Sequence, residues 1–104
     1  MRKQRESKGN LRMLEKWINC TVFPGQFTGE YAIKSTMFDG TEFSLFAPKE
    51  ALDIKQEPTL DHPVKGKIKV QIEQQEDDLL MVRLPRPTFE NGQCVTVKTE
   101  QVSS

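Results

Sequence analysis

The stretch from residue 29 to 48 constrains the fold more than any other part of the chain. It reads GEYAIKSTMFDGTEFSLFAP, and apolar residues recur at every second position on both sides of Asp39-Gly40. A period of two is typical of a β-strand with one buried face, and Asp-Gly tolerates the positive φ angles of a two-residue hairpin turn. The stretch therefore predicts an antiparallel hairpin whose inward residues are Tyr31, Ile33, Ser35, Met37, Phe43, Leu45 and Ala47.

The same alternation predicts four further strands. They cover residues 18–23, 66–73, 79–84 and 94–102, and the expected inward residues are Ile18, Cys20, Val22, Ile68, Val70, Ile72, Leu80, Val82, Leu84, Val95 and Val97. Pro24-Gly25 and Asn91-Gly92 supply turn signals between strands. Ala32, Phe38 and Phe46 put apolar residues on the opposite face of the first hairpin as well. Strands that are apolar on both sides are typical of a central or curled position.

These elements predict a mainly β protein with a six-stranded antiparallel barrel or strongly bent sheet. Oligonucleotide-binding and SH3-like barrels share this pattern of elements, and the likeness goes no further than the pattern. Asn10 is a good helix cap, and Leu11, Leu14 and Ile18 share one helical face, so we expect a short helix over 11–17. A strand that starts at Lys16 is the alternative. Residues 1–9 are expected to form a flexible basic arm, and 10–104 a single domain.

Composition predicts a soluble protein. Hydrophobic residues make up 36% of the 104 residues and charged residues 29%, which suits a folded chain with a wet surface. No apolar run approaches the ~20 residues of a membrane-spanning helix, and no apolar segment of signal-peptide type follows the basic start. We therefore expect a cytoplasmic protein with no membrane contact.

Few side chains are suited to catalysis or metal binding. His62 is the only histidine, and it lies in a loop between an aspartate and a proline. Cys20 and Cys94 lie within predicted strands, so we expect buried free thiols, although a closed barrel could bring the two together as a disulfide. No glycine-rich phosphate loop and no spaced set of metal ligands is present. The sequence favours a non-catalytic protein with no cofactor and no metal.

Two loops are candidates for contact with a ligand or partner. LPRPTFENG, residues 84–92, holds Arg86 between two prolines and ends near Phe89. It is interpreted either as a stiff sheet corner with Phe89 folded over the core or as a preformed contact loop. The loop from Ile54 to Val64 is long for a small domain. It could cover a small-ligand site at the mouth of the barrel.

Charge is unevenly distributed although the net charge is zero. Residues 1–16 carry six basic and two acidic side chains, a net +4, and the remaining residues carry −4. The arm residues Arg2, Lys3, Arg5, Lys8 and Arg12 make nucleic acid one possible partner. The preferred interpretation is a homodimer or a protein partner, because apolar side chains exceed what one small core needs. The candidate contact residues are Arg86, Phe89, Phe23, Phe27, Phe46 and Trp17.

Overall fold

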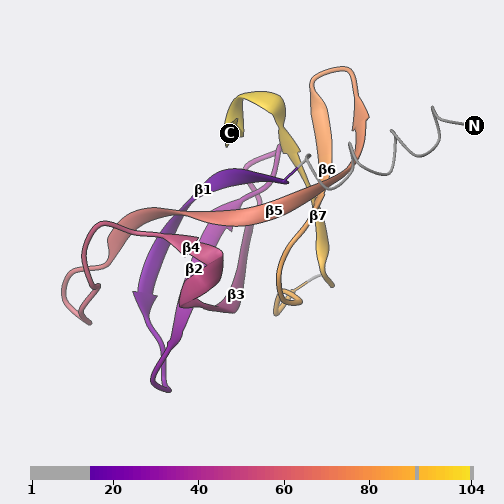
Figure 1. The fold of residues 1–104 in the computed structure, drawn as a ribbon. Helices are drawn as coiled ribbons and strands as arrows, with labels where there is room; N and C mark the ends of the chain where they lie inside the picture. Colours follow the sequence, from indigo (N-terminus) through magenta and orange to yellow (C-terminus); the bar gives the residue numbers. More distant parts are fainter. Residues whose placement is uncertain (1–14, 91, 104) are drawn as a thin grey trace, which may run out of the picture.

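The computed structural model describes residues 15–90 and 92–103, which form one antiparallel sheet curled into a half-barrel (Figure 1). Its strands follow the order β3-β2-β1-β5-β6-β7, with β4 paired to β5 and β8 paired to β1. The elements are β1 (Glu15–Pro24), β2 (Glu30–Thr36), β3 (Glu42–Pro48), η1 (Lys49–Ala51), β4 (Leu52–Asp53), β5 (Val64–Glu76), β6 (Leu79–Arg83), β7 (Cys94–Lys98), η2 (Thr99–Gln101) and β8 (Val102–Ser103).

All six strands expected from the alternation are present, and most of their expected inward residues form the core. Met37 and Ile72 are partly buried against it, and Ser35 is not part of it. Phe43, Leu45 and Ala47 have no exposed surface, and neither have Val22, Ile68, Val82 and Val97. Burial of one such aliphatic or aromatic side chain stabilises a fold by roughly 1.5–3 kcal/mol. The alternating pattern therefore identified the inner face of the sheet correctly.

The hairpin between β2 and β3 has a longer turn than the two-residue turn expected from Asp39-Gly40. The Met37 amide donates to the Thr41 carbonyl at 2.8 Å, and the Gly40 amide donates to the Met37 carbonyl at 3.1 Å. Three residues therefore lie between the last paired positions, and Gly40 adopts a φ of 87°. The third position of such a loop needs the left-handed conformation, which glycine adopts without a steric cost.

The prediction of a short helix over 11–17 is wrong for residues 15–17, the part of this range that the structure describes. Glu15 already lies opposite Gln71 of β5, and Trp17 lies opposite Lys69, so the strand begins even earlier than the alternative start at Lys16. Pairing with β5 satisfies the backbone hydrogen bonds of residues 15–18, and alternate side chains of the strand point into the core. Ile18 is one of these buried side chains. Leu11, Leu14 and the expected arm over 1–9 lie outside the described residues.

Helical structure in the described residues is limited to the two 3-10 turns, η1 and η2. The turn η1 follows Pro48, which is its N-cap and has an extended backbone. The turn η2 interrupts the last expected strand, because the Gln101 side chain accepts from the Lys98 amide at 2.7 Å and donates to the Thr36 carbonyl at 3.0 Å. None of the described residues forms a helix long and apolar enough to cross a membrane.

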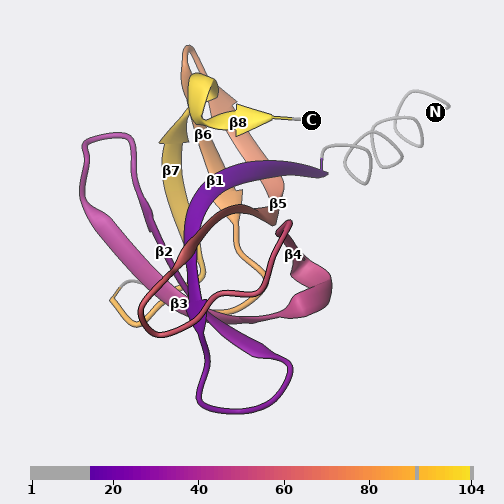
Figure 2. The same cartoon turned by 90° about the vertical axis from the view of Figure 1, so that its left-hand side faces the viewer.

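The long strand β5 joins the two halves of the half-barrel. Eight positions pair it with β1, while its other edge pairs first with β4 and then with β6. Figure 1 shows β5 running across most of the molecule, and Figure 2 shows how strongly β1 curves beside it. The register shift between Ile72 and Gln74 is a β-bulge, which increases bending and twist.

The two outer edges of the half-barrel are linked by loop residues rather than by a continuous ladder. The Phe38 amide donates to the Thr96 carbonyl of β7 at 2.9 Å, and the Phe89 amide donates to the Ser44 carbonyl of β3 at 2.9 Å. Such contacts occupy edge groups that would otherwise be free to pair with another chain. The 84–92 loop therefore contributes to closing the fold.

We expect Gly66→Ala to destabilise the protein by about 1–3 kcal/mol, the usual cost of overpacking a close contact. A Cβ atom at Gly66 would lie 2.6 Å from Cγ2 of Ile54 and 3.0 Å from the carbonyl oxygen of Asp53. Urea unfolding measures the change, with Gln71→Ala as an exposed control on the same strand. Equal stability of Gly66→Ala and the parent chain would contradict this account of the β4–β5 contact.

Candidate functional site

The loop over 84–92 is a hydrogen-bonded corner. The Leu84 amide donates to the Gln93 carbonyl at 2.9 Å, and the Thr88 amide donates to the Gly92 carbonyl at 2.8 Å. The Thr88 hydroxyl donates to the same Gly92 carbonyl at 2.7 Å, and Thr88 is only 8% exposed. Proline at 85 and 87 restricts the backbone further. The corner is therefore held in one shape, as the sheet-corner interpretation expected.

Phe89 does not fold over the core. It is 61% exposed, and its ring lies edge-on to that of Phe46, with centroids 5.1 Å apart and planes 75° apart. Phe46 points to the outer side of β3, because its neighbours Leu45 and Ala47 occupy the inner side. An edge-to-face pair contributes about 0.5–1.5 kcal/mol beyond buried area. The corner thus presents an aromatic ring on the outside of the sheet.

Strand register extends this pair into an apolar row. Phe23 lies opposite Ala32, and Ala32 lies opposite Phe46, all on the outer side of their strands. We call Phe23, Ala32, Phe46 and Phe89 the outer aromatic row. Neighbouring strands lie about 4.8 Å apart, so the row crosses three strands and the corner loop over roughly 15 Å. It joins residues that are distant in the sequence.

Charged and polar side chains flank the outer aromatic row. On one side, Arg86 Nη1 lies 3.9 Å from Glu30 Oε2, a long and partly exposed and therefore weak ion pair. On the other side, the carboxylate of Glu90 accepts from the Ser44 amide at 2.9 Å and from the Ser44 hydroxyl at 2.7 Å. These two hydrogen bonds lower the pKa of Glu90 below its ordinary value. The row therefore has an apolar centre and a polar rim.

The other residues expected at a contact surface lie elsewhere. Phe27 is 72% exposed in the turn after β1, outside the register of the row. Trp17 lies half-buried on the outer side of β1, with Lys69 Nζ 5.7 Å from the ring centroid. The basic candidates for nucleic-acid contact, Arg2, Lys3, Arg5, Lys8 and Arg12, lie outside the described residues. The structure therefore brings together Phe23, Phe46, Phe89 and Arg86 among the expected contact residues.

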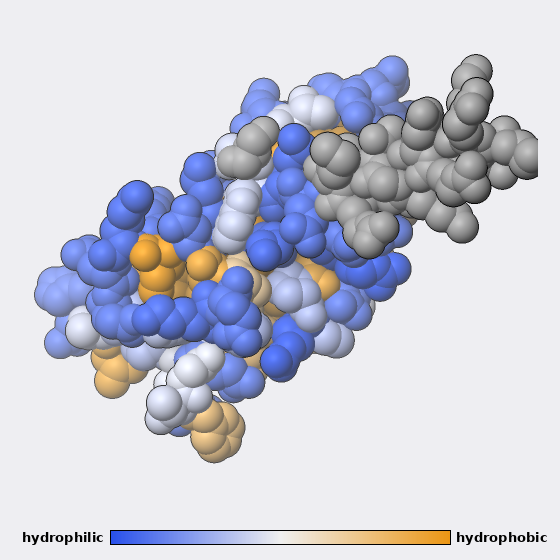
Figure 3. Space-filling view, viewed as in Figure 1, coloured by the Kyte–Doolittle hydropathy of each residue, from blue (hydrophilic) through white to orange (hydrophobic). Residues whose placement is uncertain are grey.

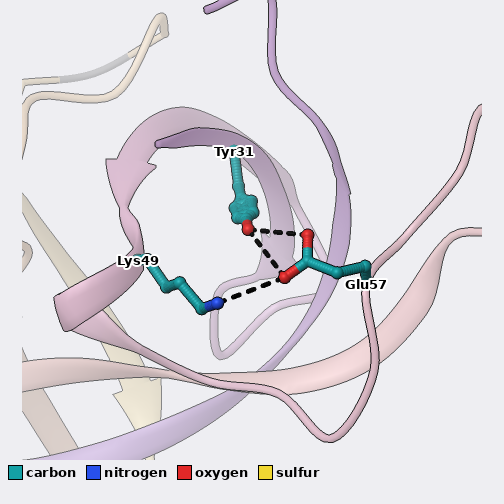
Figure 4. Close-up of polar contacts among 3 residues, drawn as sticks. All are labelled: Tyr31, Lys49 and Glu57. Carbon is teal, nitrogen blue, oxygen red and sulfur yellow. Dashed lines mark hydrogen bonds and ion pairs between the residues drawn. The ribbon is translucent and has the colours of Figure 1, made fainter. Parts of the chain in front are cut away.

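The 54–63 loop is fixed over one end of the sheet. The Tyr31 hydroxyl donates to both carboxylate oxygens of Glu57, at 2.8 and 3.1 Å, and Lys49 Nζ lies 3.3 Å from Glu57 Oε2 (Figure 4). The hydrogen bond from Tyr31 lowers the pKa of Glu57, and the contact from Lys49 lowers it further. The same hydrogen bond raises the pKa of Tyr31. Sequence alone gave no signal for this cluster.

A hollow of about 450 Å³ lies beside the part of β5 that is between its pairing with β4 and its pairing with β6. Neither β4 nor β6 pairs with Lys69 or Val70, and these two residues line the hollow. Arg83, Arg86 and Gln93 line it as well, but no residue of the 54–63 loop does. The loop is therefore not a lid over this hollow.

Reactive side chains do not gather in the described residues. Burial raises the pKa of the Cys20 thiol to about 12, which keeps it protonated and unreactive. Both cysteines are free, as expected, although Cys94 is only half-buried on β7. His62 is exposed, and its backbone is hydrogen-bonded to Thr59. Within 15–90 and 92–103, no three His, Cys, Asp or Glu side chains come together to hold a metal ion.

The surface seen in Figure 3 is mostly hydrophilic, and apolar side chains show in a few small places rather than as one broad patch. A binding surface on this face would therefore be narrow.

Comparison with known proteins does not assign the chain to a family, because no family model, no curated protein and no solved structure matches it. The function has to be argued from the residues themselves.

We expect the Glu57→Gln variant to lose less stability than the parent chain when the pH is lowered. Because the folded protein holds the pKa of Glu57 below its ordinary value of 4.5, the carboxylate stabilises the fold above that pH. This contribution disappears as the pH falls through the lowered pKa. Urea midpoints at about pH 7 and about pH 3 should therefore differ less in the variant than in the parent chain.

Asp61→Asn is the matched control, because Asp61 is exposed in the same loop. It should keep the acid sensitivity of the parent chain. An identical pH dependence of Glu57→Gln and the parent chain would show that the Tyr31–Glu57 contact does not hold the loop in solution.

Proposed function

We propose that this protein is a non-catalytic binding module that docks a short apolar segment of a partner protein on the outer aromatic row. The observation that carries the proposal is the Phe46–Phe89 pair, which places two aromatic rings in contact outside the core. Phe89 keeps most of its surface open to solvent in this arrangement. Aromatic side chains of this kind dominate the energetics of protein interfaces.

The size of the row favours a short segment over a large rigid partner. A phenylalanine side chain covers ~200 Å², so the 61% exposed Phe89 offers roughly 120 Å². Phe23 and Phe46 are half-buried and offer less. The whole row is therefore well below the ~800 Å² that each partner buries in a stable complex. Such an area suits a weak contact with a few apolar side chains.

The rigidity of the corner supports binding without a large entropic cost. Phe89 is attached to β3 through its own amide, and Thr88 is fixed by its two bonds to Gly92. Groups that already hold their bound shape lose little freedom when a ligand arrives. The partly exposed Arg86–Glu30 pair at the rim can exchange its weak internal contact for a polar group of the partner.

We expect Phe89→Ala to weaken peptide binding about tenfold, which corresponds to ~1.4 kcal/mol. The probe is a set of peptides selected from a random displayed library against the parent chain. Phe38→Ala is the matched control, because Phe38 is 41% exposed in the β2–β3 turn, away from the row. Its replacement should leave the affinity of the selected peptides unchanged.

Two results would contradict the proposal. One is a selection that yields no peptides, and the other is a set of peptides whose affinity is the same for Phe89→Ala and the parent chain. The homodimer expected from the sequence stays a prediction. Sedimentation that shows a concentration-dependent dimer, lost in Phe89→Ala, would assign the row to self-association instead of a partner segment.

A further inference from the structure

Three lysines form a regular line on the outer side of β5. Lys65, Lys67 and Lys69 alternate with Gly66 and the buried Ile68, so their side chains leave the same face of the strand. Two residues advance a strand by about 6.6 Å, which resembles the spacing of successive phosphates along a nucleic-acid strand. We call these three residues the lysine track.

The lysine track has no acidic counterpart at ion-pair distance in the described part of the chain. The four ion pairs found there use Lys34, Lys49, Arg83 and Arg86. Asp53 lies opposite Lys67 across the β4–β5 pair, yet it forms none of these contacts. Lys67 Nζ is 3.1 Å from the Ser103 hydroxyl, and Lys69 lies over Trp17. A line of like charges without close counter-charges favours a polyanion.

The neighbouring strand adds an aromatic ring and polar groups beside the lysine track. Trp17, Asn19 and Thr21 lie directly opposite Lys69, Lys67 and Lys65 on β1, on the same outer side. A hollow of about 230 Å³ is lined in part by Asn19, Thr21, Lys34 and Lys65. A second hollow, of about 200 Å³, is lined in part by Asn19, Lys55, Lys65 and Lys67. Cations, hydrogen-bonding groups and a stacking surface therefore share one narrow strip.

The part of the sequence that precedes β1 carries further positive charge. Residues 1–14 carry five basic side chains and one acidic side chain, and they join the described chain at Glu15. Glu15 lies two residues before Trp17 on β1. The acidic residues Glu73, Glu76, Asp77 and Asp78 follow Lys69 along β5 and into the β5–β6 turn, beyond Gln71, which lies opposite Glu15. Residues 65–69 themselves carry three basic side chains and no acidic side chain.

We propose that the lysine track binds single-stranded nucleic acid, with phosphates on Lys65, Lys67 and Lys69 and a base stacked on the ring of Trp17. Proteins that bind single strands combine a cationic track along the backbone with aromatic side chains under the bases. A duplex keeps its bases stacked inside, so it does not offer a base face to Trp17. The site is separate from the outer aromatic row and goes beyond the proposed function.

The chain contains a single tryptophan, so Trp17 fluorescence reports on the proposed contact directly. We expect a single-stranded oligothymidine to quench this fluorescence saturably at low salt. Three phosphate contacts predict a slope near −2 for the logarithm of the binding constant against the logarithm of salt concentration. A duplex of equal length should quench the fluorescence much less.

The decisive variant is Lys65→Ala/Lys67→Ala/Lys69→Ala, with anisotropy of a labelled oligothymidine as a second readout. Loss of all three charges should reduce affinity at low salt by about tenfold or more and flatten the salt dependence. Lys98→Ala is the matched control, since Lys98 is exposed on β7. It should retain parent affinity, and thermal unfolding should show that both variants are folded.

Unchanged oligothymidine binding in the triple variant would overturn the proposal, because positive charge elsewhere would then account for the affinity. Polyglutamate that quenches Trp17 as strongly as oligothymidine would instead assign the lysine track to acidic protein segments. Phe89→Ala should bind oligothymidine as the parent chain does. The two surfaces can therefore succeed or fail independently.

Discussion

The pairing of β1 with β5 determines both the core and the candidate surfaces. It runs from Glu15 opposite Gln71 to Val22 opposite Val64, and it places Ile18 and Ile68 on the inner side. The same register places Trp17 beside Lys69 on the outer side. A slip of one residue would exchange the two sides of a strand. Because burial of Ile18 and Ile68 opposes such a slip, the core also fixes the positions of the outer groups.

The outer side of the sheet carries two kinds of surface with different physical requirements. The outer aromatic row depends on β1, β2, β3 and the corner loop, and its apolar groups suit desolvated contact. The lysine track depends on β5 and its groups suit a hydrated, salt-sensitive contact. Thr21 and Lys34 are paired neighbours between these two surfaces. One module of this kind could hold a protein segment and a nucleic-acid strand side by side.

Alternation in the sequence predicted the strands and the inner residues because the period of a pleated strand is local. The helix expected over 11–17 failed because the helical spacing of Leu11, Leu14 and Ile18 competes with pairing to β5, which lies about fifty residues away in the chain. The outer aromatic row was beyond prediction for a similar reason. Phe23, Phe46 and Phe89 were each candidates, but only strand order and the return of the corner loop bring them together. The Tyr31–Glu57 contact likewise depends on where a long loop returns.

One edge of β1 pairs with two strands, of which β2 is close in the sequence and β8 is distant in the sequence. Thr21 to Pro24 pair with β2, whereas Trp17 and Ile18 pair with Ser103 and Val102 of β8. During synthesis, the hairpins over β1, β2 and β3 can form while later residues are still inside the ribosome. The start of β1 cannot complete its hydrogen bonding on that edge until residues 102 and 103 have emerged. Completion of the sheet beside Trp17 therefore depends on a pairing between residues that are distant in the sequence, which is the kind of contact that slows folding.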